Sequence, residues 1–303
     1  MRALSAIGPL NGRPAIITSA GPISKASGNG PIGMRFTASG GPPPALRAIT
    51  NNTPSPPEAT PSPATTRPPL KWAGGKRWQV PHLLPLWKAY ARNRLVEPFA
   101  GGLAVTLGLS PDRALLNDAN PHLVNFYRWL KRGLTTVIKM ENNEKLFYRH
   151  RTRFNELITH GNGDTAEAAA LFYYLNRTGY NGLCRFNSKG GFNVPFGSYD
   201  RIVYTHDFTA YRGVFEDWNF TVGDFEALKL KPSDFVYADP PYDVEFTAYS
   251  KGGFSWDDQV RAAEWLSHHK GPVILVNQAT QRIDELYRNL GYAVHFLDAP
   301  RRI

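Results

Sequence analysis

Cysteine is almost missing from the sequence, and its scarcity excludes two kinds of protein. The chain of 303 residues contains one cysteine, Cys184. A single thiol cannot form an internal disulfide framework, and by itself it cannot build a structural zinc site. We therefore expect no metal centre and a reducing, cytoplasmic setting.

Long apolar runs and nicotinamide-type glycine motifs are also missing. No apolar stretch approaches the roughly 20 residues that a membrane-spanning helix needs, so we expect no membrane association. The absence of a G-x-G-x-x-G fingerprint disfavours nicotinamide-dependent enzymes. A hydrophobic content of 42% does suffice for a core, and the net charge of +10 fits a polyanionic partner without proving one.

Residues 1–67 are rich in Pro, Gly, Ser, Thr and Ala and have few large apolar side chains. Such a segment cannot bury enough surface to offset the conformational entropy that ordering would cost. We therefore predict a disordered tail without assigned function. A transit peptide, an over-extended gene start and a linker from a lost upstream domain all remain open.

The rest of the chain alternates between short apolar runs and helical patterns, which predicts an open α/β sheet with right-handed crossovers. The expected strands begin at residues 95, 114, 220, 235, 272 and 293. The expected helices cover residues 103–109, 121–130, 257–270 and 280–290. Between about 134 and 217 the alternation stops. There a helical run at 167–175 leads into a polar, aromatic and glycine-rich stretch, which we expect to form a β-hairpin.

The tetrapeptide Asp239-Pro240-Pro241-Tyr242 follows the apolar run at 235–238. Ligands of open α/β sheets bind at the carboxyl ends of such strands. The two prolines fix the backbone, so that the carboxylate, a carbonyl and the tyrosine ring form a rigid set. Two acceptors and an aromatic face suit the planar amino group of an extruded nucleobase. The alternative is a turn whose prolines merely end the strand.

Three further patterns carry candidate ligand groups. Glycine turns at 74–75 and 101–102 allow close approach of a ligand, and Lys76 follows the first of them. Asp118 ends the strand that begins at 114, where a carboxylate binds ribose hydroxyls or caps the next helix. Arg and Asn side chains in the expected hairpin suit the edges of guanine and adenine, although most such hairpins are only solvated loops.

The order and spacing of four motifs resemble one known family. These are Lys71–Lys76, Glu97–Gly102, Asn117-Asp118 and the tetrapeptide at 239–242. From about Pro69 onward the chain resembles the Dam-type, D12 class DNA adenine-N6 methyltransferases, and the stretch 176–197 is similar to their target-recognition hairpin.

The resemblance implies a Rossmann-like methyltransferase sheet with helices on both faces and an inserted, mostly helical target-recognition domain with a β-hairpin. Residues 68–133 and 218–303 would form the catalytic domain that binds S-adenosylmethionine. Residues 134–217 would form the DNA-binding insertion. The implied reaction transfers a methyl group to N6 of an adenine flipped out of double-stranded DNA. A monomer is expected, and a partner restriction endonuclease is compatible with the family.

The resemblance also implies site residues. The catalytic residues would be Asp239, Pro240, Pro241 and Tyr242. The cofactor would contact Trp72, Ala73, Gly74, Lys76, Phe99, Gly101, Asp118, Asp224, Phe225 and Asp239. The DNA would contact Arg177, Asn181, Leu183, Arg185, Asn187, Asn193 and Pro195. Of these, Leu183, Arg185, Asn187, Asn193 and Pro195 match the hairpins of family members that read GATC, which is the target that the resemblance implies.

Three departures from the family pattern keep alternatives open. Leu103 stands where the family commonly has a glycine, and Ser198 stands where readers of GATC usually have a basic residue. The family normally continues beyond the equivalent of Ile303 into a last antiparallel strand, and we expect its absence to leave a sheet edge unpaired. A catalytically weak or inactive DNA-binding relative is therefore one alternative. A same-fold N-methyltransferase acting on RNA or on protein glutamine is another.

Overall fold

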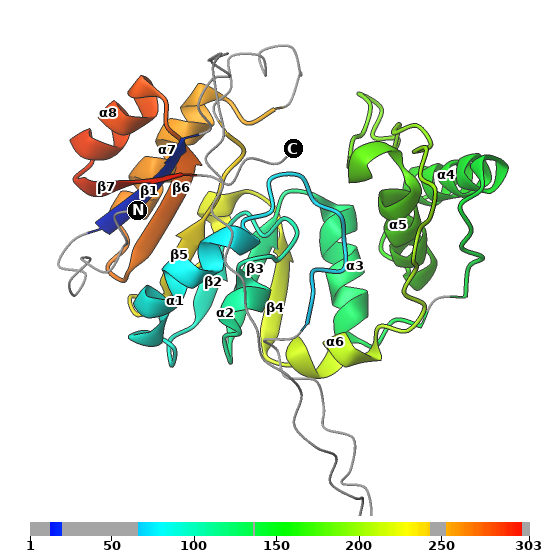
Figure 1. The fold of residues 1–303 in the computed structure, drawn as a ribbon, viewed down its shortest axis with the longest axis horizontal. Coiled ribbons are helices and arrows are strands. Elements are labelled where there is room, and N and C mark those ends of the chain that lie inside the picture. The colour runs from blue at the N-terminus through cyan, green and yellow to red at the C-terminus, as the bar shows by residue number, and fades with distance from the viewer. Residues whose placement is uncertain (1–12, 20–65, 136, 243–252, 299–303) are drawn as a thin grey trace, which may run out of the picture. The chain divides into compact units, whose positions relative to one another are not determined.

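The predicted α/β class is confirmed by the computed structural model, which describes residues 13–19, 66–135, 137–242 and 253–298. The strands form one sheet in the order β4-β3-β2-β5-β6-β1-β7, and every pairing in it is parallel. Figure 1 shows helices on both sides of this sheet. None of the helices in these ranges is both long and apolar enough to cross a bilayer.

Every strand except β1 lies close to where the hydrophobic runs predict it. Their bounds are β1 Arg13–Ser19, β2 Leu95–Glu97, β3 Ala114–Asp118, β4 Trp218–Val222, β5 Phe235–Ala238, β6 Val273–Gln278 and β7 Tyr292–Asp298. Strands that are buried on both faces need continuous apolar runs. This explains why β2, β3 and β5 could be predicted from the sequence.

The helices are α1 Val80–Lys88, α2 Thr106–Leu109, α3 Pro121–Lys131, α4 Glu144–Thr159, α5 Ala166–Thr178, α6 Thr209–Val214, α7 Trp256–Ser267 and α8 Gln281–Asn289. Short 3-10 turns are η3 Arg77–Gln79, η4 Tyr180–Gly182 and η5 Phe225–Ala227. Helix α4 has no counterpart among the predicted elements. It is mostly polar and buries an apolar stripe of Leu146, Phe147, Phe154 and Leu157.

Two hydrophobic cores cover the two faces of the sheet. Along β5, Phe235 and Tyr237 point into one core, and Val236 and Ala238 point into the other. This alternation follows from the two-residue period of a strand. Helices α1, α3 and α5 pack in the first core, and α7 and α8 pack in the second. The sheet is therefore held rigidly from both sides, and its carboxyl ends are fixed.

The prediction of a disordered tail over residues 1–67 is wrong at β1. This strand lies between β6 and β7 and pairs with both, with Ala15 opposite Leu275 on one side and Val294 on the other. At the sheet's edge, β7 pairs with β1 and not with β6. Strand β7 is therefore the terminal strand on this side of the sheet and is paired on one side among the described residues. A composition averaged over the whole segment hid the short β-branched run inside β1.

Of the β-hairpin that we predicted after α5, the structure shows short antiparallel contacts without assigned strands. Among the described residues this stretch makes isolated antiparallel bridges at Phe186–Phe192 and Gly179–Phe196. Its turn is closed by the Asn187 side chain, whose Oδ1 accepts hydrogen bonds from the backbone amides of Lys189 and Gly191 at 3.0 Å each. Local side-chain acceptors compete with ladder pairing, so the segment is a tethered loop and not a pair of strands.

Edge strand β4 is protected by side chains of α3. Arg128 donates through Nη2 to the Phe220 carbonyl at 2.9 Å, and Lys131 donates to the Trp218 carbonyl at 2.8 Å. Carbonyls that face away from β3 are therefore occupied. Covering an edge with cationic side chains is a recognised way to prevent strand-to-strand association.

Candidate active site

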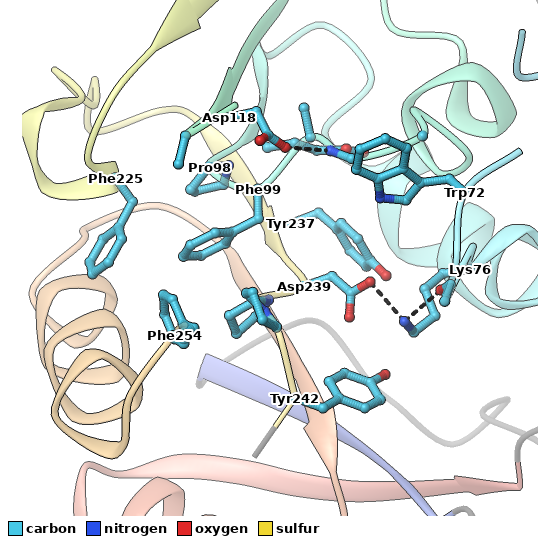
Figure 2. A pocket seen from close by; sticks show the side chains of 18 of the residues that line it. Trp72, Lys76, Pro98, Phe99, Asp118, Phe225, Tyr237, Asp239, Tyr242 and Phe254 are labelled. Carbon is cyan, nitrogen blue, oxygen red and sulfur yellow. Dashed lines mark hydrogen bonds and ion pairs between the residues drawn. The ribbon is translucent and has the colours of Figure 1, made fainter. Parts of the chain in front are cut away.

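A cavity of about 650 Å³ opens at the carboxyl ends of β2, β3 and β5. Its remaining walls come from the segment 72–76, from η5 and from residues 253–258. Figure 2 shows the side chains that converge on it from these elements. The volume lies within the range of pockets that hold a small cofactor, roughly 300–1,000 Å³.

Lys76 and Asp239 form a partly buried ion pair at one end of the cavity. The Lys76 ammonium donates to Asp239 Oδ2 at 2.8 Å and to the Gly74 carbonyl at 2.7 Å. It also lies 4.5 Å from the centroid of the Tyr242 ring. The other carboxylate oxygen, Asp239 Oδ1, is buried and has no hydrogen-bond partner among the described residues. One oxygen is thus fixed by the lysine, and the other remains available as an acceptor (Figure 2).

The charges of this pair are set by opposing effects. Burial raises the pKa of Asp239, and the adjacent Lys76 ammonium works against that rise. Burial disfavours the charged form of Lys76, but the Asp239 carboxylate and Tyr242 outweigh it and raise the pKa of the ammonium overall. Lys76 therefore stays cationic and supports the ionised form of Asp239.

Glu97 is a second buried carboxyl group beside the cavity, and sequence reasoning assigned it no role. It ends β2 with 3% of its surface exposed and accepts a hydrogen bond from the Thr106 hydroxyl at 2.6 Å. Burial raises its pKa to about 8, against the effect of that hydrogen bond. Glu97 is therefore mostly protonated at neutral pH and adds no second negative charge beside Asp239. An acid at the end of an apolar strand was the signal that could have revealed it.

Trp72 packs directly on the glycine turn after β2. A Cβ added at Gly101 would lie 2.8 Å from Trp72 Nε1, and one added at Gly102 would lie 2.7 Å from Trp72 Cβ. Both positions therefore require glycine. The departure at Leu103 has a structural cost, because its φ of 58° is left-handed. Left-handed backbone costs roughly 1–2 kcal/mol for a residue with a Cβ, whereas a fully buried leucine contributes roughly 2–5 kcal/mol, so the leucine side chain outweighs the strain.

Asp118 lines the cavity at the end of β3. Its Oδ2 accepts the Gly101 amide at 3.0 Å, and its Oδ1 accepts the Asn120 amide at 2.9 Å. The helix cap that was the alternative role belongs to Asn120, whose side chain accepts from the first amides of α3. A carboxylate has about four acceptor sites, so two remain on Asp118 for a ligand.

Three aromatic rings close the far end of the cavity. Phe99 lies 5.3 Å from Phe225 and 5.5 Å from Phe254, measured between ring centroids, and Asp224 precedes this group on the wall. An apolar slot with an acceptor at its rim suits a purine ring. Among the described residues no cluster of three or more His, Cys, Asp or Glu side chains could hold a metal ion.

Every residue predicted for catalysis or for the cofactor lines this one cavity. The residues predicted to read DNA lie elsewhere, in and after the end of α5. Of these, Asn181, Arg185, Asn187 and Pro195 are exposed, and Arg177, Leu183 and Asn193 are partly buried. Arg185 is held by Asn193, with Nε donating to Oδ1 at 2.8 Å.

Two asparagines that had no predicted role fix this reading segment. Asn155 of α4 accepts the Phe192 amide at 2.8 Å and donates to the Phe192 carbonyl at 3.1 Å. Asn176, which is 1% exposed, accepts the amide of Lys71 and donates to the carbonyls of Lys71 and Gly182. The segment that leads into the cavity is thereby joined to the predicted DNA reader.

The fold and the cavity together define an α/β protein with a pocket at the carboxyl ends of its sheet, where open α/β sheets bind their ligands. Comparison with known proteins makes this specific. The chain belongs to the D12 class N6 adenine-specific DNA methyltransferases, a family that matches residues 72–302.

Among its relatives is the retron Ec67 DNA adenine methylase of Escherichia coli, 36% identical over 77% of this chain and 84% of the relative. A DNA adenine methylase of Vibrio cholerae is 37% identical over 77% of this chain and 88% of the relative. The type II methyltransferase M1.LlaDCHI of Lactococcus lactis is 34% identical over 78% and 88%.

Proposed function

We propose that this enzyme uses S-adenosylmethionine and methylates N6 of an adenine that is flipped out of duplex DNA, with GATC as its target. The observation that carries the proposal is the Asp239 carboxylate, with one oxygen paired to Lys76 at 2.8 Å and the other buried with no hydrogen-bond partner among residues 66–135, 137–242 and 253–298. An unpartnered buried acceptor at the end of a strand is costly unless a donor arrives in the functional complex.

The residues of the cavity fit the proposed cofactor. The aromatic slot at Phe99, Phe225 and Phe254 suits an adenine ring, and Asp118 has free acceptor capacity for ribose hydroxyls. Trp72 packs closely on Gly101 and Gly102, and all three residues line the cavity. When bound, S-adenosylmethionine would supply an electrophilic methyl group on its sulfonium sulfur.

The protein's own contribution is positioning and electrostatics. Asp239 Oδ1 would accept one N6 hydrogen of the target adenine, and the Pro240 carbonyl would accept the other, which orients the nitrogen lone pair. The Tyr242 ring would stack on the extruded base. The Pro241 carbonyl is held by Gln259 Nε2 at 2.7 Å, so the turn that presents these groups is fixed. Such preorganisation lowers a barrier without any covalent enzyme intermediate.

Three features support a DNA reader over residues 176–197. The segment presents exposed Arg185 and Asn187 side chains and is tethered to the cavity side through Asn176. Relatives with 36–37% identity carry the name DNA adenine methylase. We place the catalytic domain at 68–133 and 218–303 and the DNA-binding insertion at 134–217.

The proposal is tested by transfer of a labelled methyl group from S-adenosylmethionine to duplex DNA, followed by sequencing for modified adenines. Methylation at GATC supports every part of the proposal. Methylation of adenines in another sequence keeps the chemistry and contradicts the target. Binding of the cofactor with no transfer to any duplex would favour the inactive DNA-binding alternative.

A further inference from the structure

Arg261 on α7 gathers three carboxylates behind the aromatic end of the cavity. Its Nη2 lies 3.0 Å from Asp224 Oδ2 and 2.6 Å from Glu226 Oε2, and its Nη1 lies 2.7 Å from Asp258 Oδ1. The three acids come from η5 and from the first turn of α7. One guanidinium thereby joins two separate elements of the cavity wall.

Arg261 lies outside the cavity wall, unlike two of the three acids that it holds. Asp224 and Asp258 line the cavity, whereas Arg261 and Glu226 do not. The Arg261 guanidinium carbon also lies 4.9 Å from the centroid of the Phe225 ring, a cation–π distance. Arg261 therefore supports both the carboxylate and the ring at this end of the cavity.

We propose that Arg261 is a positioning residue that holds the Asp224 carboxylate as the acceptor for the 6-amino group of the cofactor's adenine, and so sets the preference for adenine over 6-oxo purines. This inference rests on the proposed function of the cavity. A fixed carboxylate accepts hydrogen bonds from an amino group and repels a carbonyl oxygen at the same place. Arg261 also offsets the mutual repulsion of the three acids, which would otherwise favour turning Asp224 toward water.

A merely structural network is the competing explanation. Exposed ion pairs contribute little to stability, and Arg261 could simply join η5 to α7. That explanation predicts equal effects on all ligands of the cavity. The positioning role predicts an effect on the choice between ligands, and the two explanations are separable by measuring a ratio.

The experiment measures, by calorimetry without DNA, the affinities of the full-length protein for S-adenosylhomocysteine and for its 6-oxo analogue, S-inosylhomocysteine. We expect the unchanged protein to prefer the amino compound by ~tenfold or more, since a charged hydrogen bond is replaced by a repulsive contact. In Arg261→Gln the affinity for S-adenosylhomocysteine should fall, and the ratio should approach one. Arg261→Lys should keep only part of the preference for S-adenosylhomocysteine, because a single ammonium cannot contact all three carboxylates.

Two further variants keep the test decisive. Arg288→Gln removes an arginine that pairs with Asp284 at 2.8 Å on α8, and it should leave the ratio unchanged. Asp224→Asn should bring the ratio of the two affinities toward one, as Arg261→Gln does. The double variant should have the same ratio as either single variant, because both substitutions act through the Asp224 carboxylate. The Asp224 variant also tests the inference if Arg261→Gln does not fold.

An equal loss of both affinities in Arg261→Gln, or an unchanged ratio, would overturn the role of Arg261. Failure of the unchanged protein to bind S-adenosylhomocysteine at all would contradict the proposed function itself. The two failures are therefore distinguishable within one set of titrations.

Discussion

The cavity and the segment proposed to read DNA are built in different ways. Cavity side chains such as Asp239 and Glu97 stand at strand ends fixed by two cores, and their partners are buried. The reading segment after α5 carries exposed side chains on a loop that two asparagines tether. Catalysis requires a few atoms to be held in one geometry. Recognition of DNA sequence requires a surface whose side chains can vary between related enzymes without disturbing the core. A substitution in the cavity should therefore affect rate, and one in the segment should affect sequence choice.

The sharpest test of this difference is Asp239→Ala. It removes the acceptor for N6, so methyl transfer should fall by ~10³-fold or more, as when a single preorganised group is lost from an active site. Binding of S-adenosylhomocysteine should remain measurable by calorimetry. Retained turnover would show that Asp239 does not act on the base.

Breaking β1 tests how far the cavity depends on the sheet. Ile16→Pro removes a backbone donor in a strand that has a neighbour on each side, and should lower the free energy of unfolding by ~1–3 kcal/mol. Denaturant titration measures this value. Ile16→Val keeps the donor and serves as the control. An unchanged midpoint in the proline variant would mean that β1 adds no stability to the sheet.

On the reading side, Arg185→Ala should relax sequence choice while leaving the reaction at any methylated adenine intact. A bidentate contact to a base is worth roughly 1–3 kcal/mol of discrimination, so the preference for the best target should fall by ~10–100-fold. Sequencing of modified adenines in random duplexes measures the profile. The same profile in the variant would remove Arg185 from base reading.

A different kind of effect, a dependence of stability on pH, is expected at Glu97. Its pKa is raised to about 8 in the folded protein against an ordinary value of 4.5, so the folded state binds more protons between these values. Stability from this group is full below about pH 4.5 and is lost as the pH rises through about 8, by up to ~1.4 kcal/mol per pH unit. Glu97→Gln cannot ionise, so its stability relative to the unchanged protein should improve as the pH rises. Parallel pH dependences would mean that Glu97 is already ionised.

The sequence alone determined the strand ends and the residues that meet there. Strands β2, β3 and β5 are continuous apolar runs, and their terminal Asp118 and Asp239 lie at one edge because parallel strands all end on the same side. Local patterns record such information, since a strand buried on both faces needs apolar residues at successive positions. Trp72 was recognisable only through the family motif, because nothing in its own neighbourhood shows that it packs on Gly101.

Only the tertiary structure decided the long-range contacts. Nothing near Arg13–Ser19 indicates that this strand lies between β6 and β7, which come more than 250 residues later in the chain. Arg261 likewise meets Asp224 across 37 residues, and Lys76 meets Asp239 across 163. In a sequence, a charged side chain has many possible partners of opposite charge. The packing of the sheet decides which one it meets, because a buried charge can pair only with a group that the fold brings within reach.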